Sequence, residues 1–277
     1  MIMNVKVINN YAKLKTTLFF LPLILLLVIL IFLFSQDSLT TFKYVQIQKD
    51  YFLYINHYLG QYPNLEYNLT QLGDASVFLS FLIIFIVYAP KIWEAILTAS
   101  LASLLFSCLL KNLFLVPRPA QIFDNHSFII VGKTAIGFSS LPSGHSITVF
   151  TILTVLLFAF MTEKLNYKIL WVFSVVFTGL IIVFSRVGVG AHHPLDVIIG
   201  SIIGYISGLI GIFASRKYKI WNWVNNKKYY PIFILLIVIC GISFIIKINR
   251  ESFIIFDLAL ISLIVSLYKI IHVYVKK

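Results

Sequence analysis

The sequence predicts an all-α protein, a polytopic membrane helix bundle, and two observations lead to this prediction. Hydrophobic residues make up 60% of the chain and charged residues only 12%, whereas soluble domains carry about half apolar and about a quarter charged residues. Several apolar runs also lack charge, and a bilayer span needs about 20 such residues. Lipid rather than water is therefore expected to be the main solvent of this chain.

Eight apolar runs are interpreted as membrane spans, and the shorter ones need flanking residues to reach the required length. They lie at Thr16–Ser35, Ala75–Pro90, Ala95–Leu110, Ser146–Met161, Ile169–Phe184, Leu195–Ala214, Pro231–Ile246 and Phe253–Leu267. The last run contains Asp257, and a charge there indicates a position near the membrane face or a polar partner.

The net charge of +12 would favour nucleic-acid binding in a soluble chain. Here the basic residues occupy alternate loops and the two terminal segments. They are Lys6, Lys13, Lys15, Lys164, Lys168, Arg216, Lys217, Lys219, Lys227, Lys228, Lys269, Lys276 and Lys277. With eight spans, all of them fall on one side of the membrane, which the positive-inside rule identifies as the cytoplasm. Both termini are therefore expected in the cytoplasm, and no nucleic-acid partner is expected.

The first apolar run, Thr16–Ser35, follows a basic start and so has features of a secretory signal. It is long for the apolar region of a signal, and Phe34-Ser35-Gln36-Asp37 is not a small-residue cleavage site. We therefore expect a retained membrane anchor. Cys108 and Cys240 both fall inside predicted spans, where they are interpreted as small apolar residues rather than as a disulfide or a metal pair.

Residues 36–74 form a long outward loop that mixes aromatic and charged side chains. Among them are Tyr44, Tyr51, Phe52, Tyr54, Tyr58, Lys43, Lys49 and Asp50. The composition fits an amphipathic helix that lies along the lipid headgroups. It fits a plain extramembrane loop equally well, and the sequence does not decide between these two interpretations.

Three polar clusters lie at span ends on the same outward side, where charge near a membrane is costly and indicates function. The first contains Lys111 and Arg118, which are two helical turns apart and would share one face of a continuing helix. Pro117 and Pro119 are expected to end that helix. An Arg and a Lys together suit a phosphate, although two cations at a span end can also simply reach the headgroups.

The second cluster, Pro142-Ser143-Gly144-His145, directly precedes the fourth span. Ser143 is a plausible N-cap, and the free N–H groups that follow it at a helix N-terminus form a natural phosphate site. Gly144 lets the backbone approach an oxygen closely, and His145 can give or take a proton near neutral pH. An ordinary serine cap followed by a chance histidine is the alternative.

The third cluster surrounds the start of the sixth span. Pro194 suits the first helical turn, which places His192 just outside the helix and Asp196 within its first turn. A carboxylate there can accept an imidazole N–H and leave the other ring nitrogen free to attack. Alternatively, Asp196 only complements the helix dipole and Arg186 is an interface cation. His193 is a rival to His192, but its spacing to Asp196 is less suitable.

Taken together, the clusters resemble the three-part signature of the type 2 phosphatidic acid phosphatase superfamily: K-x6-R-P, then P-S-G-H, then S-R-x5-H-x3-D. The matching residues are Lys111, Arg118 and Pro119, then Pro142-Ser143-Gly144-His145, then Ser185, Arg186, His192 and Asp196. Every defined position matches, in the same order and spacing. The resemblance covers the first six spans, residues 1–218. It implies a six-span phosphatase core, with residues 219–277 as an additional C-terminal helical hairpin.

The resemblance also implies a role for each matching residue. His192 would be the nucleophile, Asp196 its orienting partner and His145 the acid that protonates the leaving oxygen. The phosphate cradle would consist of Lys111, Arg118, Ser143, Gly144 and Arg186. No metal or other cofactor is implied, and the chain has no carboxylate cluster of the kind that Mg²⁺ sites use.

The expected function is therefore hydrolysis of a phosphate monoester or diphosphate on a membrane lipid at the outer face of a bacterial inner membrane. Lipid A, undecaprenyl diphosphate, phosphatidylglycerol phosphate and phosphatidic acid are all candidates. A transporter or flippase of a phosphorylated lipid is the main alternative, but its polar site would lie near the bilayer midplane. Vanadium haloperoxidases share the family's pocket but are soluble, and the intact signature argues against a non-catalytic member.

Overall fold

The computed structural model describes residues 2–251 and 253–276, and every regular element in these ranges is a helix. The fold class expected from the sequence is thus confirmed. The elements are α1 (Ile2–Ala12), η1 (Thr16–Phe19), α2 (Phe20–Ser35), α3 (Thr41–Gln46), α4 (Lys49–Gly60), α5 (Pro63–Gln71), α6 (Ala75–Leu82), α7 (Phe85–Tyr88), α8 (Pro90–Phe114), α9 (Pro119–Ile122), α10 (Gly144–Ala159), α11 (Leu165–Gly188), α12 (Pro194–Lys217), η2 (Asn222–Asn225), η3 (Lys227–Tyr229), α13 (Tyr230–Arg250) and α14 (Ile254–Val275).

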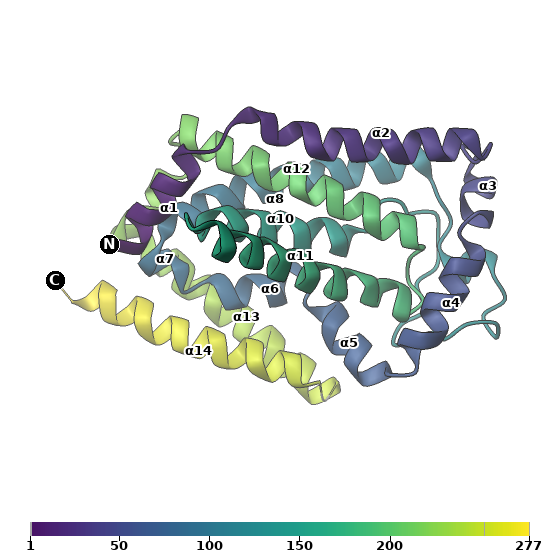
Figure 1. Ribbon diagram of the computed structural model, residues 1–277. Helices are drawn as coiled ribbons and strands as arrows, with labels where there is room; N and C mark the ends of the chain where they lie inside the picture. Colours follow the sequence, from purple (N-terminus) through teal and green to yellow (C-terminus); the bar gives the residue numbers. More distant parts are fainter. Residues whose placement is uncertain (1, 252, 277) are drawn as a thin grey trace.

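Six helical segments in the described chain are long and apolar enough to cross a bilayer, which makes this a multi-pass membrane protein. They contain α2, α8, α11, α12, α13 and α14. The other two expected spans are shorter: α10 has 16 residues, and the run from Ala75 to Pro90 is divided into α6 and α7. All eight segments run lengthwise along the bundle in alternating directions (Figure 1).

The break between α6 and α7 corrects the expectation of one continuous helix over Ala75–Pro90. The N–H groups of Ile86 and Val87 bond to carbonyls three residues back, at 3.1 Å each, which tightens the chain at this point. The indole Nε1 of Trp93 donates to the carbonyl of Leu82 at 3.0 Å. A backbone group that would otherwise stay unpaired in lipid is thereby satisfied, so the break is tolerated.

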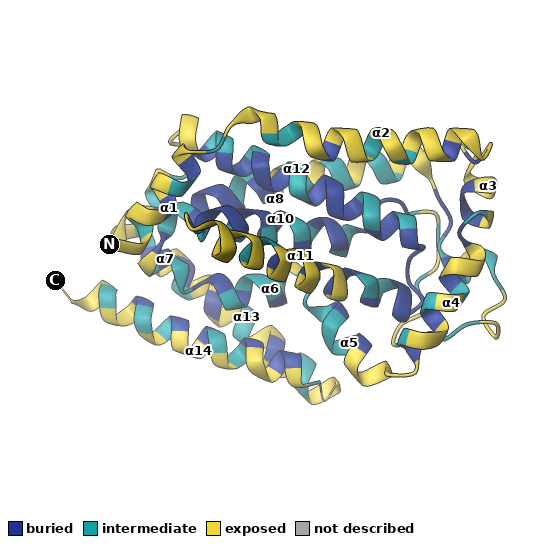
Figure 2. Cartoon of the chain, in the orientation of Figure 1, coloured by how far each residue is buried: buried dark blue, intermediate teal, exposed yellow. Residues whose placement is uncertain are grey.

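The helices are arranged around a central group, α8, α10 and α12, with α2 on one side and the α13–α14 hairpin on the other (Figure 1). Helices α10 and α12 and the first part of α8 are largely buried, whereas α2, α13, α14 and the second half of α8 expose their outer faces (Figure 2). In α12, 61% of the most apolar stretch is buried, against 11% in α2. The outer helices and the second half of α8 therefore meet lipid, and α10, α12 and the first part of α8 form the protein core.

Close packing between α12 and α10 depends on small residues. A Cβ atom added at Gly200 would lie 2.7 Å from the carbonyl oxygen of Ser143, and one at Gly204 would lie 2.5 Å from that of Ile147. Glycine removes this conflict and lets the two backbones approach, as is common between helices in membranes. As a result, the N-termini of α10 and α12 lie together, and Ser143 N–H donates to the Asp196 carbonyl at 3.0 Å.

Both ends of the described chain lie at the same end of the bundle, at the left of Figure 1. The opposite end carries residues 36–74, which fold as α3, α4 and α5 rather than as a plain loop. Helix α4 buries Phe52 and Asn56 and exposes Tyr51 and Tyr54. The Asn56 amide donates to carbonyls of Ile129, Val187 and Gly188, which attaches this segment to the end of α11.

The C-terminal hairpin packs against this same end of the protein. The Tyr67 hydroxyl of α5 donates to Glu251 Oε2 at 2.6 Å, and the N–H of Ile255 donates to Asn68 Oδ1 at 3.1 Å. The Tyr67 ring stacks on Phe253 with 4.1 Å between centroids. The turn between α13 and α14 is therefore held by α5.

Candidate active site

The three polar clusters converge at the end of the bundle opposite the chain termini. Lys111 lies in the last turn of α8, and Arg118 directly precedes α9. Ser143 is the N-cap of α10, and Arg186 lies in the last turn of α11. The remaining groups stand at the start of α12. The ends of α8 and α11 and the starts of α9, α10 and α12 thus bring together residues that are up to 85 positions apart.

Asp196 is fully buried in the first turn of α12 and accepts three hydrogen bonds. Tyr44 Oη donates to Oδ1 at 2.9 Å, Ser140 Oγ donates to Oδ2 at 2.6 Å, and the N–H of His193 donates to Oδ2 at 3.0 Å. A buried carboxylate is costly unless it is well hydrogen-bonded. These three donors meet that requirement and hold the carboxylate in one orientation.

His192 does not bond directly to Asp196 as the sequence predicted. Its Nδ1 lies 3.7 Å from Asp196 Oδ2, which is too long for a hydrogen bond. Ser140 Oγ lies 3.4 Å from the same Nδ1. The Ser140 hydroxyl hydrogen points to Asp196, so its oxygen can accept from Nδ1–H. This arrangement connects His192 to Asp196 through Ser140 and leaves Nε2 without a proton.

The charge state of His192 also suits a nucleophile. The side chain is 1% exposed, and this burial lowers the pKa of His192 to about 3, with Arg118 and Arg186 contributing in the same direction and Asp196 opposing them. A buried imidazole resists protonation because its charged form loses hydration. His192 is therefore neutral at physiological pH.

His193 points away from the other groups. Its Nε2 donates to the carbonyl of Pro117 at 3.1 Å, and its ring packs edge-on against Phe52 and Phe123, with centroids 5.8 Å and 5.7 Å away. The backbone N–H of His193, together with Asp196, forms a capping box at the start of α12. These contacts are typical of a structural histidine.

The cationic groups approach the same space from different helices. A Cβ atom added at Gly144 would lie 3.4 Å from Lys111 Nζ, so the lysine ammonium stands directly at the N-terminus of α10. Arg118 Nη1 donates to the carbonyl of Ala191 at 3.3 Å, beside His192. Arg186 Nη1 donates to Thr70 Oγ1 at 2.6 Å, and its buried Nε has no partner. Three cations with unused donors can surround one anion.

The N-terminus of α10 adds backbone donors to this group. Ser143 Oγ accepts the N–H of Ser146 at 3.4 Å, as expected for an N-cap. The N–H groups of Gly144 and His145 belong to the first turn, where helical residues have no partner within the helix. A phosphate can use such groups. His145 packs tightly on Gly73, where an added Cβ would lie 2.8 Å from the His145 Cβ.

Four contributing residues were not predicted from the sequence. Ser140 lies three positions before the predicted cap, and Tyr44, Gln48 and Thr70 belong to the segment 36–74, which no signature covers. Gln48 Oε1 accepts the N–H of Leu195 at 2.7 Å and its amide donates to the Tyr44 carbonyl. Proximity to the second signature was the only available signal for Ser140. The other three residues had none, because their partners are distant in sequence.

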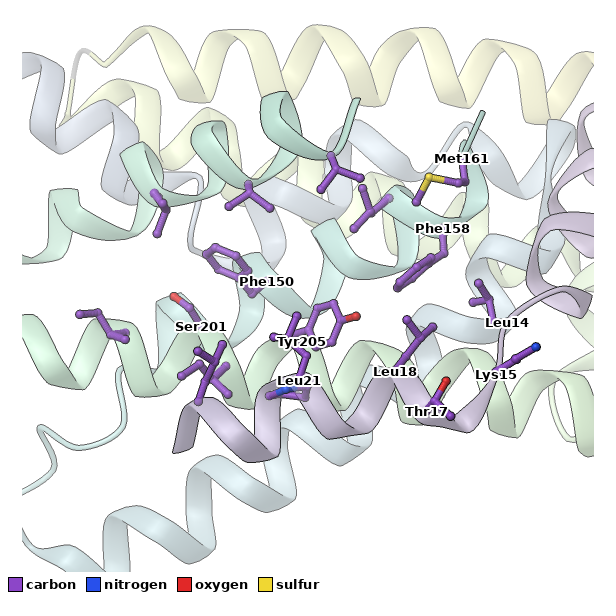
Figure 3. Close-up of a pocket in the computed structure, with 18 of the residues that line it drawn as sticks. Leu14, Lys15, Thr17, Leu18, Leu21, Phe150, Phe158, Met161, Ser201 and Tyr205 are labelled. Atoms are coloured by element: carbon purple, nitrogen blue, oxygen red, sulfur yellow. The ribbon is translucent and has the colours of Figure 1, made fainter. Parts of the chain in front are cut away.

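A large groove lies elsewhere, between the start of α2 and helices α10, α11 and α12 (Figure 3). It has a volume of about 820 Å³ and a mostly apolar lining, with Lys15 at one end and hydroxyls from Ser201 and Tyr205. None of the site residues predicted from the sequence lines it. The structure describes all of those residues, so their chemistry is separate from this groove.

The cluster around His192 offers no obvious metal site. Among the residues that the structure describes, no group of three or more His, Cys, Asp or Glu side chains is arranged to hold a metal ion. Positive charge at this end of the bundle comes from arginine and lysine instead, which bind phosphate oxygens directly.

Comparison with known proteins gives a consistent result. Residues 91–221 match the family model described as PAP2 superfamily. The chain is 30% identical over 135 residues to the undecaprenyl-diphosphatase BcrC of Bacillus subtilis (strain 168), a match that covers 46% of this chain and 64% of the relative. The crystal structure of Aquifex aeolicus LpxE aligns with a TM-score of 0.50 and 27% identity, over 62% of this chain and 96% of that one.

The chain thus spans slightly less than two thirds of the length of its curated relative. All eight sequence-predicted site residues lie inside the matched segment 91–221, whereas Tyr44 and Thr70 lie before it. The family that the three-part signature resembles is thus the one that the comparisons support.

Proposed function

Residues 91–221 belong to the PAP2 superfamily, and from this premise we propose that the protein is an integral membrane phosphatase that releases phosphate from a lipid. The observation that carries the proposal is the convergence of His192, His145 and three cations at one end of the bundle. A neutral imidazole with a free nitrogen, a second histidine and a cationic pocket are the groups that phosphoryl transfer through a covalent intermediate needs.

In the first step, His192 Nε2 attacks phosphorus, so a P–N bond forms while the bond from phosphorus to the lipid oxygen breaks. His145 must be protonated in this step; it gives its proton to the leaving oxygen, and the lipid departs with a free hydroxyl or, from a diphosphate, a terminal phosphate. In the second step, neutral His145 takes a proton from water. The water oxygen attacks phosphorus, the P–N bond breaks, and inorganic phosphate and free His192 result.

The cradle stabilises the negative charge that spreads over the three equatorial oxygens during transfer. Lys111, Arg118 and Arg186 contribute fixed positive charge, and Ser143 and Gly144 place backbone donors at the N-terminus of α10. Asp196 acts through Ser140 to hold the His192 tautomer, and its negative charge stabilises the cationic phospho-imidazole. No step requires a metal ion.

The orientation in the membrane is also part of the proposal. The basic loops that the sequence analysis identified lie at the end that carries both termini, and the positive-inside rule supports a cytoplasmic position for that end in a bacterial cell. The catalytic cluster then faces the exterior or periplasm, at headgroup level. Residues 1–218 form the catalytic core, and residues 219–277 are a hairpin added to it.

The test is phosphate release by the purified protein in detergent with EDTA present, from undecaprenyl diphosphate, lipid A, phosphatidylglycerol phosphate and phosphatidic acid in parallel. Release that persists in EDTA and disappears in His192→Ala supports the proposal. A transporter or flippase of the same lipids would move them without stoichiometric phosphate release, so the absence of release from every lipid would contradict the proposal.

A further inference from the structure

A cavity of about 400 Å³ opens beside His145, between α6, α8 and α10. Its size falls within the range of small-molecule sites. Gly144 and His145 form one end of it, so it is continuous with the candidate active site. Other lining residues are Gly73, Asp74, Ala75, Leu79, Ser100, Ser103, Leu104, Ser107, Ile147, Thr148, Thr151 and Ile152.

Hydroxyl-bearing residues from two helices line this cavity. Ser100, Ser103 and Ser107 follow one face of α8, and Thr148 and Thr151 belong to α10. Serine and threonine in membrane helices often only bond to their own backbone, and two of these do. Ser103 Oγ donates to the Ser100 carbonyl at 2.9 Å, and Thr148 Oγ1 donates to the Gly144 carbonyl at 3.1 Å.

Thr151 differs from these residues. It is 1% exposed, and its buried Oγ1 has no hydrogen-bond partner in the protein. Buried polar atoms are almost always paired, and one that is not needs an explanation. Because Thr151 lines the cavity, a polar group of a bound molecule can supply the missing partner.

The charges around the cavity restrict the kind of polar group that fits. No lysine or arginine belongs to its lining, all of which the structure describes, and the Lys111 ammonium stands at the Gly144 end, beside the phosphate cradle. Asp74 brings a carboxylate to the rim, where it accepts from Ser76 and lies 3.8 Å from Lys247. A neutral hydroxyl-bearing group is matched by these walls, because the Asp74 carboxylate is already paired with Lys247 and a second phosphate would find no lysine or arginine among the lining residues.

We propose that this cavity, formed by α6, α8 and α10, binds the neutral, hydroxyl-bearing part of the lipid next to the scissile phosphate, a sugar or glycerol unit. The inference rests on the proposed phosphatase function. In-line transfer places the leaving oxygen opposite His192, on the side of His145, and the group attached to that oxygen enters the cavity. The preferred substrate is then a phosphate monoester of a sugar or glycerol lipid, not a prenyl diphosphate.

The lipid tails also have an exit from this cavity. Leu79 and Leu104 belong to its lining, and Leu104 is 61% exposed on the outer side of α8. Hydrocarbon chains attached to the sugar or glycerol unit can pass these two side chains into the surrounding bilayer. The serine and threonine hydroxyls of the cavity therefore recognise the sugar or glycerol unit beside the phosphate, and the lipid tails need no enclosed site.

The experiment compares kcat/KM for phosphatidylglycerol phosphate and lipid A with kcat/KM for farnesyl phosphate and farnesyl diphosphate, using the purified full chain. Thr151→Val and Ser103→Ala remove one hydroxyl each at nearly constant volume. We expect the wild type to prefer the glycerol or sugar monoester. The preference is measured as kcat/KM for the glycerol or sugar monoester divided by kcat/KM for farnesyl phosphate. This ratio should fall roughly 5- to 50-fold in the variants, because a site that recognises substrate hydroxyls loses discrimination when one of its hydrogen-bonding partners is removed.

Ser207→Ala on α12 is the matched control, because its hydroxyl bonds to the Ile203 carbonyl and lies outside the cavity. It should leave the ratio unchanged, and thermal unfolding of every variant checks that it is folded. An unchanged ratio in Thr151→Val and Ser103→Ala, or a wild-type preference for farnesyl diphosphate, would overturn the cavity assignment alone. Failure of the wild type to release phosphate from any substrate would overturn the proposed function and the cavity assignment together.

Discussion

Tyr44 donates its hydroxyl hydrogen to Asp196 across 152 positions of sequence, with 2.9 Å between Oη and Oδ1, and both side chains are buried. This bond joins helix α3, which lies outside the segment that matches the PAP2 model, to the acid beside the proposed nucleophile. The segment 36–74 is therefore a structural part of the candidate site rather than a peripheral loop.

Tyr44→Phe should lower kcat roughly tenfold and leave KM within about twofold. Removing the hydroxyl leaves a buried carboxylate with one donor fewer, and hydrogen bonds to charged groups contribute about 1.5–3 kcal/mol. Steady-state kinetics with the best lipid of the panel measure the effect. Tyr54→Phe, on the exposed face of α4, is the control, and equal losses in both variants would contradict a specific role for Tyr44.

Ser140→Ala should reduce kcat by roughly tenfold or more, because Ser140 Oγ is the group between His192 Nδ1 and Asp196 Oδ2. Without it, the 3.7 Å separation of the two side chains is not bridged, and the imidazole loses its orienting partner. The neighbouring Ser139→Ala should behave like the wild type. If Ser140→Ala retained full turnover, the connection through Ser140 would not matter for catalysis.

Thr70→Val should weaken phosphate binding more than it slows the chemical step. Arg186 Nη1 bonds to Thr70 Oγ1 at 2.6 Å, and losing a hydrogen bond to a charged group, which contributes about 1.5–3 kcal/mol, lets the guanidinium move. We expect KM and the inhibition constant of vanadate, a phosphate mimic, to rise roughly 2- to 10-fold. Thr41→Val, at an exposed position of α3, controls for general effects, and a loss confined to kcat would contradict this account.

His192→Ala should abolish turnover, whereas His193→Ala should remain active with a lower melting temperature. His193 is packed between two phenylalanine rings and bonds to the Pro117 carbonyl, so its removal leaves a cavity without removing the nucleophile. The second measurement detects the phospho-enzyme: the protein reacts with a substrate that carries a labelled phosphate, is denatured without acid, and is tested for bound label. If His193→Ala were the inactive variant and His192→Ala still formed phospho-enzyme, the nucleophile assignment would be wrong.

Glu66 should make the stability of the protein depend on pH. Burial raises the pKa of Glu66 from an ordinary 4.5 to about 7, so between these values the folded state binds more protons than the unfolded state. The free energy of unfolding therefore falls as pH rises from 4.5 to 7. The Glu66→Gln variant is neutral at this position at every pH, so its free energy of unfolding does not undergo this fall.

Melting temperatures in detergent at pH 5 and pH 8 measure this effect. The wild type should lose roughly 2–5 °C relative to Glu66→Gln over that interval, by the usual conversion for chains of this size. Glu163→Gln is the control, since Glu163 is exposed and its hydrogen bond from Lys13 lowers its pKa. A constant difference between wild type and Glu66→Gln across the interval would show that Glu66 does not titrate in the folded protein.

Much of the fold and of the candidate site could be predicted from the sequence because both depend on local patterns. Apolar runs report the spans directly, since lipid requires every exposed side chain to be apolar. The family signature predicted which residues would converge, among them Lys111, His145 and His192. The division of Ala75–Pro90 into α6 and α7 was not predictable, because the carbonyl it frees is satisfied by Trp93, which belongs to the next helix.

The sequence by itself determined the membrane class and the resemblance to the PAP2 superfamily, and it predicted the groups proposed to carry phosphoryl transfer. Only the tertiary structure decided how those groups are held. Tyr44, Ser140 and Thr70 lie 152, 56 and 116 positions from the partners they position, and the hydroxyl-lined cavity beside His145 forms only where α6, α8 and α10 meet. Hydrogen bonds and cavities between helices depend on packing, and no spacing rule along the chain encodes which side chains will face each other.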